Sequence, residues 1–160
     1  EKAAQLRQYG WSTKYRVDLG GARSSRLDEM QAAILSVFLP NLDAANARRR
    51  EIATMYSTRI AHKNILVPEK GDANYIAHLY VVQSAERDAL RAHLRSEDIA
   101  ADIHYPIPDH RQPLFKDRFE YVHLKNTERL SNEILTLPCY PEMTDAQVEQ
   151  VIRSINSWQS

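Results

Sequence analysis

Apolar residues recur at helical spacing in the first third of the chain. Intervals of three, four, three and one residues separate the members of one stripe, namely Leu27, Met30, Ile34, Val37 and Phe38. Ser25, with Asp28 three residues later, resembles a capping box and predicts that the helix begins there. Pro40 lacks a backbone donor, so we expect it to break or bend the helix.

A second helical stretch follows Pro40 on a very polar background. Its apolar positions keep helical spacing: Leu42, Ala45, Ile52, Met55, Tyr56 and Ile60. The basic run Arg48-Arg49-Arg50 lies within this stretch, and we interpret it as a solvated surface. Two long helical segments around Pro40 are therefore predicted.

The middle of the chain has the pattern of a strand, a helix and a second strand. Ala77–Ser84 is rich in β-branched and aromatic residues, and Ile99–Tyr105 alternates as a strand does. Between them, Glu86–Arg95 carries two leucines one turn apart and predicts a helix. Asn64–Pro68 is a further candidate for a short strand.

The C-terminal third predicts a helix at Glu128–Ile134, a short strand at Leu135–Leu137 and a turn at Pro138–Pro141. Thr144 with Gln147 is a capping box that opens a last helix. The apolar stripe of this helix consists of Val148, Val151, Ile152 and Ile155. The order of elements predicts an α/β fold of the α+β type, with a small sheet covered by helices.

The first 25 residues differ from the rest of the chain. EKAAQLRQYG resembles the last turns of a helix, with Gly10 as a left-handed C-terminal cap. We expect Trp11–Ser25 to be irregular, with a tight turn at Gly20-Gly21. Since nothing before Glu1 could cap that helix, we expect the chain to begin inside a larger protein.

Composition narrows the functional classes. Lysine and arginine balance aspartate and glutamate at 21 each, so no net charge attracts nucleic acid or an anionic membrane. A single cysteine, Cys139, fits a reducing cytoplasm, and no apolar run reaches the ~20 residues of a membrane span. Neither GxGxxG nor GxxxxGK occurs, which argues against Rossmann or P-loop nucleotide binding.

Ser24, Ser25 and Arg26 form the first candidate site. They stand where a helix is predicted to begin, and free backbone N–H groups there favour an anion. The guanidinium and two hydroxyls add donors. The alternative is that Ser25 is only a cap and Arg26 only a surface charge.

The second candidate site is the segment from Asp102 to His110, where two histidines, a tyrosine and two carboxylates surround two prolines. Strand alternation would place Asp102 and His104 on one face and Tyr105 on the other. The remaining histidines lack the spacing of metal ligands, and no serine sits on a nucleophile elbow. Structural histidines in a loop are the alternative.

Two stretches resemble the DegT/StrS family of sugar-nucleotide aminotransferases. They are SRLDEMQAAIL at Ser25–Leu35 and HYPIPDHRQP at His104–Pro113. Supporting stretches span nearly the whole chain in the family's order. The resemblance implies the C-terminal part of an aspartate-aminotransferase-like, fold type I enzyme. Residues 1–25 would end the large cofactor domain, 26–61 would form connecting helices, and 62–160 would form the small domain.

The resemblance implies pyridoxal phosphate as cofactor, a sugar-nucleotide substrate, glutamate as the amino donor, and a homodimer without nucleic-acid or membrane partners. The family's Schiff-base lysine would precede Glu1. The chain would then contain no catalytic residue, bind no cofactor by itself and be inactive alone. The spacing of the histidines independently predicts no metal site.

The resemblance also implies which residues line the site across the dimer. Arg26 matches an arginine that meets anionic substrate groups in the neighbouring subunit. Ser24 stands where the family usually has an asparagine on the cofactor phosphate. His104, Tyr105 and His110 match the loop that lines the sugar-nucleotide pocket.

Two alternatives stay open at this point. Some relatives use the cofactor for dehydration, and only the lysine position would separate them from transaminases. The chain could also be a cofactor-free binding module.

Overall fold

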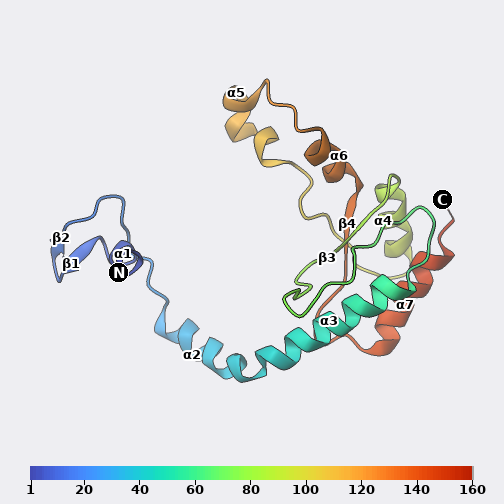
Figure 1. The fold of residues 1–160 in the computed structure, drawn as a ribbon, viewed down its shortest axis with the longest axis horizontal. Coiled ribbons are helices and arrows are strands. Elements are labelled where there is room, and N and C mark those ends of the chain that lie inside the picture. The colour runs from blue at the N-terminus through green and yellow to red at the C-terminus, as the bar shows by residue number, and fades with distance from the viewer. Residues whose placement is uncertain (160) are drawn as a thin grey trace. The chain divides into compact units, whose positions relative to one another are not determined.

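The computed structural model describes residues 1–159 and divides the chain into two compact units, 1–42 and 43–160 (Figure 1). The predicted three-part division into 1–25, 26–61 and 62–160 stays a prediction. No helix in the described part of the chain is both long and apolar enough to cross a membrane.

Unit 1 begins with a short helix and a hairpin. The elements are α1 (Lys2–Leu6), β1 (Trp11–Thr13), β2 (Arg16–Val17), α2 (Glu29–Phe38) and the 3-10 turn η1 (Leu39–Asn41). Trp11 pairs with Val17 in the antiparallel hairpin. The prediction that Trp11–Ser25 is irregular was therefore wrong for the hairpin, because strands of three and two residues are too short to show a period of two. Residues 18–25 form no strand and include the predicted turn at Gly20-Gly21.

Gly10 has the left-handed conformation that the sequence predicted, with φ +75°, but its predicted role as the helix cap was wrong, because α1 ends at Leu6 and its C-cap is Arg7. It lies beyond the end of α1, and its carbonyl accepts from the N–H groups of Asp18 and Leu19 at 3.0 and 3.2 Å. A Cβ at this position would collide with the Leu19 carbonyl oxygen. Gly10 therefore permits the close approach that starts the hairpin.

The predicted capping box at Ser25 was wrong. α2 begins at Glu29, and its N-cap is Asp28, whose Oδ1 accepts from the N–H groups of Met30 and Gln31 at 2.9 and 3.4 Å. The Ser25 N–H instead donates to the Arg7 carbonyl at 3.0 Å. A carboxylate at the N-cap satisfies the free N–H groups directly, so the helix needs no earlier cap.

Unit 2 contains helices around a two-stranded sheet. Its elements are α3 (Leu42–Arg59), β3 (Tyr80–Gln83), α4 (Arg87–Ser96), η2 (Asp109–Arg111), η3 (Pro113–Phe115), α5 (Lys116–Phe119), α6 (Lys125–Glu133), β4 (Ile134–Leu137) and α7 (Asp145–Ser157). β3 and β4 are antiparallel, with Tyr80 opposite Leu137 and Gln83 opposite Ile134. The two long helices around Pro40 are confirmed, and η1 is the only interruption between α2 and α3 in the described chain.

The predicted strand Ile99–Tyr105 is reduced to one bridge, between Asp102 and Thr136. Side chains form hydrogen bonds with the backbone groups on either side of Asp102. Asp102 Oδ1 accepts from the Ile103 N–H at 2.9 Å, and Arg91 Nε donates to the Ala101 carbonyl at 3.2 Å. Such local bonds compete with a ladder, so the strand was wrongly predicted. Asn64–Pro68 likewise forms one bridge, at Leu66.

The core of unit 2 lies where α3, α4 and α7 meet the sheet. The four apolar residues predicted for α7 are all buried, together with Ile52, Tyr56, Leu90, Leu94 and Leu135. The Thr144–Gln147 capping box is present, because Thr144 Oγ1 accepts from the Gln147 N–H and Gln147 Oε1 accepts from the Thr144 N–H. Both predictions are confirmed.

The basic run on α3 is not a solvated surface, contrary to our interpretation. Arg48 Nη2 donates to the Met143 carbonyl at 2.9 Å and to Asp145 Oδ1 at 2.6 Å. Arg49 Nη1 donates to the Cys139 carbonyl at 2.5 Å. These arginines fasten α3 to the segment that leads into α7.

Candidate functional site

The first candidate site, at Ser24 and Arg26, lies in an extended segment that runs beside the end of α1. The Arg23 N–H donates to the Leu6 carbonyl at 3.2 Å, and Gln8 forms an antiparallel bridge with Ser24. The side chains of Ser24 and Arg26 are exposed, and neither has a hydrogen bond or ion pair among the described residues. Backbone pairing thus fixes the segment while these donors stay available.

The chemistry of this segment suits an anion, but the predicted contribution of the helix start was wrong. The Asp28 carboxylate already occupies the N–H groups at the start of α2. Positive charge comes instead from arginines on the paired segments, because Arg7 and Arg23 are also exposed. Guanidinium groups and hydroxyls donate in the geometry that phosphate or carboxylate oxygens accept.

The second candidate site begins with a contact between the loop and the sheet. His104 Nδ1 lies 2.9 Å from the Thr136 hydroxyl oxygen on β4. The ring of Tyr105 stands edge-on to that of His104, with centroids 5.5 Å apart. Tyr105 is 71% exposed, so it faces solvent while His104 is held by the sheet.

His110 is buried and belongs to a separate polar cluster. Its Nε2 lies 2.9 Å from Glu128 Oε1 at the start of α6. Arg111 donates to the same oxygen through Nε at 3.1 Å and Nη2 at 2.7 Å. The hydrogen bond from His110, followed by those from Arg111, lowers the pKa of Glu128 to about 2.

Sequence reasoning missed Glu128 and Arg111. Glu128 lies 18 residues from His110 and 17 from Arg111, so no helical or strand period connects them. In the structure, the rings of His104 and Tyr105 contact each other, and His110 contacts Glu128. No hydrogen bond in the described chain joins these two pairs. Among the described residues, no group of three or more His, Cys, Asp or Glu could hold a metal.

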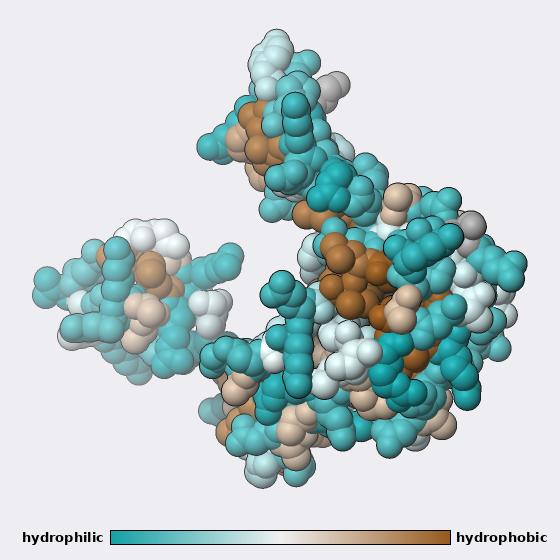
Figure 2. All heavy atoms as spheres, turned by 45° about the vertical axis from the view of Figure 1, so that its right-hand side comes forward, coloured by the Kyte–Doolittle hydropathy of each residue, from teal (hydrophilic) through white to brown (hydrophobic). Residues whose placement is uncertain are grey.

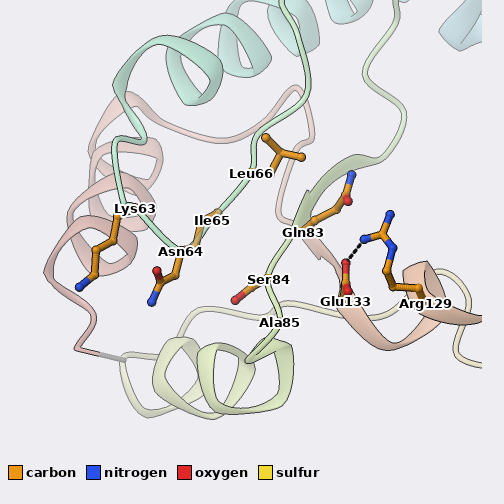
Figure 3. Close-up of a pocket in the computed structure, with 9 residues that line it drawn as sticks. All are labelled: Lys63, Asn64, Ile65, Leu66, Gln83, Ser84, Ala85, Arg129 and Glu133. Carbon is orange, nitrogen blue, oxygen red and sulfur yellow. Dashed lines mark hydrogen bonds and ion pairs between the residues drawn. The ribbon is translucent and has the colours of Figure 1, made fainter. Parts of the chain in front are cut away.

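A pocket of about 320 Å³ lies elsewhere in unit 2, between residues 63–66, the end of β3 and α6 (Figure 3). Lys63 and Arg129 stand on opposite sides of it, and Arg129 is paired with Glu133. Because the two positive charges do not converge, the lining of the pocket does not indicate a class of ligand. None of the predicted site residues lines it.

Comparison with known proteins gives one consistent result. The model of the DegT/DnrJ/EryC1/StrS aminotransferase family matches residues 1–156. The chain is 38% identical over 159 residues to dTDP-3-amino-3,6-dideoxy-alpha-D-galactopyranose transaminase from Aneurinibacillus thermoaerophilus, covering 99% of this chain and 43% of the relative. It is 36% identical to UDP-N-acetyl-3-dehydro-alpha-D-glucosamine 3-aminotransferase from Acidithiobacillus ferrooxidans, covering 94% and 40%.

Solved structures agree with this. The crystal structure of S. venezuelae DesV in complex with a ketimine intermediate superposes with a TM-score of 0.88 at 34% identity, over 96% of this chain and 42% of that one. An aminotransferase from Brucella abortus superposes with a TM-score of 0.85 at 29% identity, over 96% and 42%. The fold is thus that of the C-terminal portion of a fold type I sugar aminotransferase, as predicted. The chain spans about 40–43% of the length of the curated relatives that it matches.

Proposed function

Because the chain belongs to the DegT/DnrJ/EryC1/StrS aminotransferase family, we propose that the whole protein transfers an amino group to a keto-deoxysugar nucleotide. The observation that carries this proposal is the similarity along 99% of the chain to a transaminase of a dTDP-linked amino sugar. A second relative acts on a UDP-linked 3-keto sugar. The product would serve deoxysugar or surface-polysaccharide biosynthesis.

Aminotransferases of this family use pyridoxal phosphate, and one structural neighbour contains the amine form of that cofactor. When bound, the cofactor acts as the electron sink for amino transfer. Unit 1 offers donors that fit its phosphate, namely the Ser24 hydroxyl and the Arg26 guanidinium, exposed and without partners in the described chain. Serine reaches less far than the asparagine usual in the family, so we assign the phosphate contact to Ser24 together with Arg26.

We place the lysine that holds the cofactor upstream of Glu1. Five of the six lysines have described side chains, and all five are exposed: Lys2, Lys14, Lys63, Lys70 and Lys125. A lysine that forms an imine at neutral pH needs a depressed pKa, which burial or a neighbouring cation provides. Residues 1–160 would accordingly be inactive alone.

The loop from His104 to His110 would contact the sugar nucleotide. Tyr105 has the exposure to touch a ligand, and the Thr136 hydroxyl orients the His104 ring behind it. His110 would act from within the loop, because its ring is buried against Glu128. Arg26 would serve the neighbouring subunit of a homodimer, with glutamate as the donor.

The direct test is an activity panel with the full-length protein, pyridoxal phosphate and glutamate. The substrates would be 3-keto and 4-keto deoxysugars linked to dTDP or UDP. We expect an amino-sugar nucleotide from at least one of them, detected by mass spectrometry. A dehydrated sugar without amine incorporation would contradict transamination, and no conversion of any member would contradict the substrate class.

A further inference from the structure

The segment of residues 105–123 follows the His104–Thr136 contact and has one further hydrogen-bonded anchor of its own. In the part of the chain that the structure describes, every hydrogen bond joining this segment to the rest of unit 2 ends on Glu128 Oε1. The other side-chain bonds of the segment stay inside it. Arg111 Nη2 lies 3.1 Å from His123 Nδ1, and Gln112 Nε2 donates to the Ile107 carbonyl at 3.3 Å.

Glu128 also holds the far end of the segment. Its Oε1 accepts from the Leu124 N–H at 3.4 Å, immediately after residue 123. One carboxylate oxygen thus contacts His110 and Arg111 within the segment and Leu124, the residue that follows it. Because Glu128 lies in the first turn of α6, which continues directly into β4, the anchor is coupled to the sheet.

Packing does little to replace this anchor. Tyr105, Leu114 and Tyr121 are 71%, 84% and 89% exposed. Figure 2 shows apolar side chains on the surface of the region around α5, at the top of the view. His110, by contrast, is buried, and no other described side chain of the segment is. The position of the segment therefore depends on the bonds of Glu128 more than on burial.

We propose that Glu128 is a positioning residue for the loop from His104 to His110. By holding His110 and Arg111, it fixes the end of the loop opposite the His104–Thr136 contact, and so sets the position of Tyr105 and the affinity for the sugar nucleotide. The inference rests on the proposed function of that loop. Glu128 itself touches no substrate. When a loop is already held in its bound conformation, binding does not have to offset the entropy lost on ordering the loop, so the affinity is higher.

The test compares variants of the full-length enzyme. Glu128→Ala removes every bond of the anchor, and we expect KM for the sugar nucleotide to rise at least about tenfold, with KM for glutamate unchanged. Glu128→Gln keeps an acceptor oxygen but loses the charge, so its KM should fall between wild type and Glu128→Ala. Glu133→Gln, on the same helix and paired with Arg129, is the matched control and should behave as wild type.

Hydrogen–deuterium exchange supplies a readout that does not depend on catalysis. Residues 105–123 should exchange faster in Glu128→Ala than in wild type or Glu133→Gln, while α7 stays protected. An active wild type with unchanged exchange and unchanged KM in Glu128→Ala would overturn the inference and leave the proposed function intact. Faster exchange throughout unit 2 would also overturn it, since Glu128 would then stabilise the domain and not the loop. A wild type that aminates no sugar nucleotide refutes the proposed function instead.

Discussion

His104 Nδ1 lies 2.9 Å from the Thr136 hydroxyl oxygen, and this pair joins the start of the loop from His104 to His110 to β4. Thr136 is buried, and its backbone also exchanges both hydrogen bonds with Asp102, at 3.1 and 2.7 Å. The hydroxyl is therefore held in place by the sheet. It orients the imidazole of His104, which is half-buried.

Thr136→Val tests this relationship. Valine keeps the shape of threonine but leaves the His104 ring without its partner, so the ring should lose its fixed orientation. We expect KM for the sugar nucleotide to rise several-fold and the free energy of unfolding to fall by about 1 kcal/mol. The control is Thr127→Val, at an exposed position on α6. Equal kinetics in both variants would show that the contact has no role in the site.

Arg26 should act in the partner's active site. Subunits carrying Arg26→Ala, mixed with subunits whose cofactor lysine is replaced, should form heterodimers with one intact site. Activity well above that of either parent is expected, because one site of the heterodimer then carries both defects and the other site carries neither. Verified heterodimers that recover no activity would show that Arg26 serves its own subunit.

Two buried tyrosines make the free energy of unfolding depend on pH in the alkaline range. Burial raises the pKa of Tyr80 to about 12 and raises the pKa of Tyr56 further. An unfolded tyrosine ionises near pH 10. The contribution of the buried, neutral tyrosines to the free energy of unfolding is therefore fully present below about pH 10. It is lost as the pH rises towards 12.

Urea unfolding between about pH 9 and pH 11 measures this dependence. The free energy of unfolding should fall with pH, and Tyr80→Phe should show a shallower fall, although it also loses the 2.8 Å hydrogen bond with Ser57. Identical slopes for the two proteins would mean that Tyr80 ionises normally in the folded state.

The sequence predicted best where the physical signal is local. The capping box of Thr144 and the apolar stripe of α7 lie within one helix, and both appear as predicted. The predicted strand at Ile99–Tyr105 was wrong because the Asp102 carboxylate and the Arg91 guanidinium form hydrogen bonds with its backbone groups. The alternation of apolar and polar residues carries no signal of such bonds.

The candidate site was only partly predictable, for the same reason. His104, Tyr105 and His110 stand close together in the sequence, so their segment could be singled out. The partners Thr136 and Glu128 come from other elements and show no spacing signal. Arg48 and Arg49 were misread because their partners lie about 90 residues away or more.

The apolar stripe of α2 should be an interface in the full-length protein. Met30, Val37 and Phe38 are 72%, 71% and 66% exposed, and no residue of α2 is buried. Covering even ~400 Å² at ~25 cal/mol per Å² would contribute on the order of 10 kcal/mol, before the costs of association. Such a surface rarely stays open on a soluble monomer.

Sedimentation at micromolar concentration tests this expectation. The full-length protein should be a dimer, and Val37→Glu combined with Phe38→Glu should shift it to monomer. Gln31→Glu adds charge at a polar position of the same helix and should leave the dimer intact. A strictly monomeric wild type would refute the interface.

Amino transfer itself is the central claim, and isotope tracing measures it most directly. The full-length protein would be incubated with pyridoxal phosphate, ¹⁵N-labelled glutamate and the keto-deoxysugar nucleotide that the panel identifies. We predict that the label appears on the sugar carbon that carried the ketone, with one 2-oxoglutarate formed per amino sugar. Arg26→Ala should lower the rate without changing the product. A keto sugar that is recovered unlabelled, or converted without gaining nitrogen, would contradict the account.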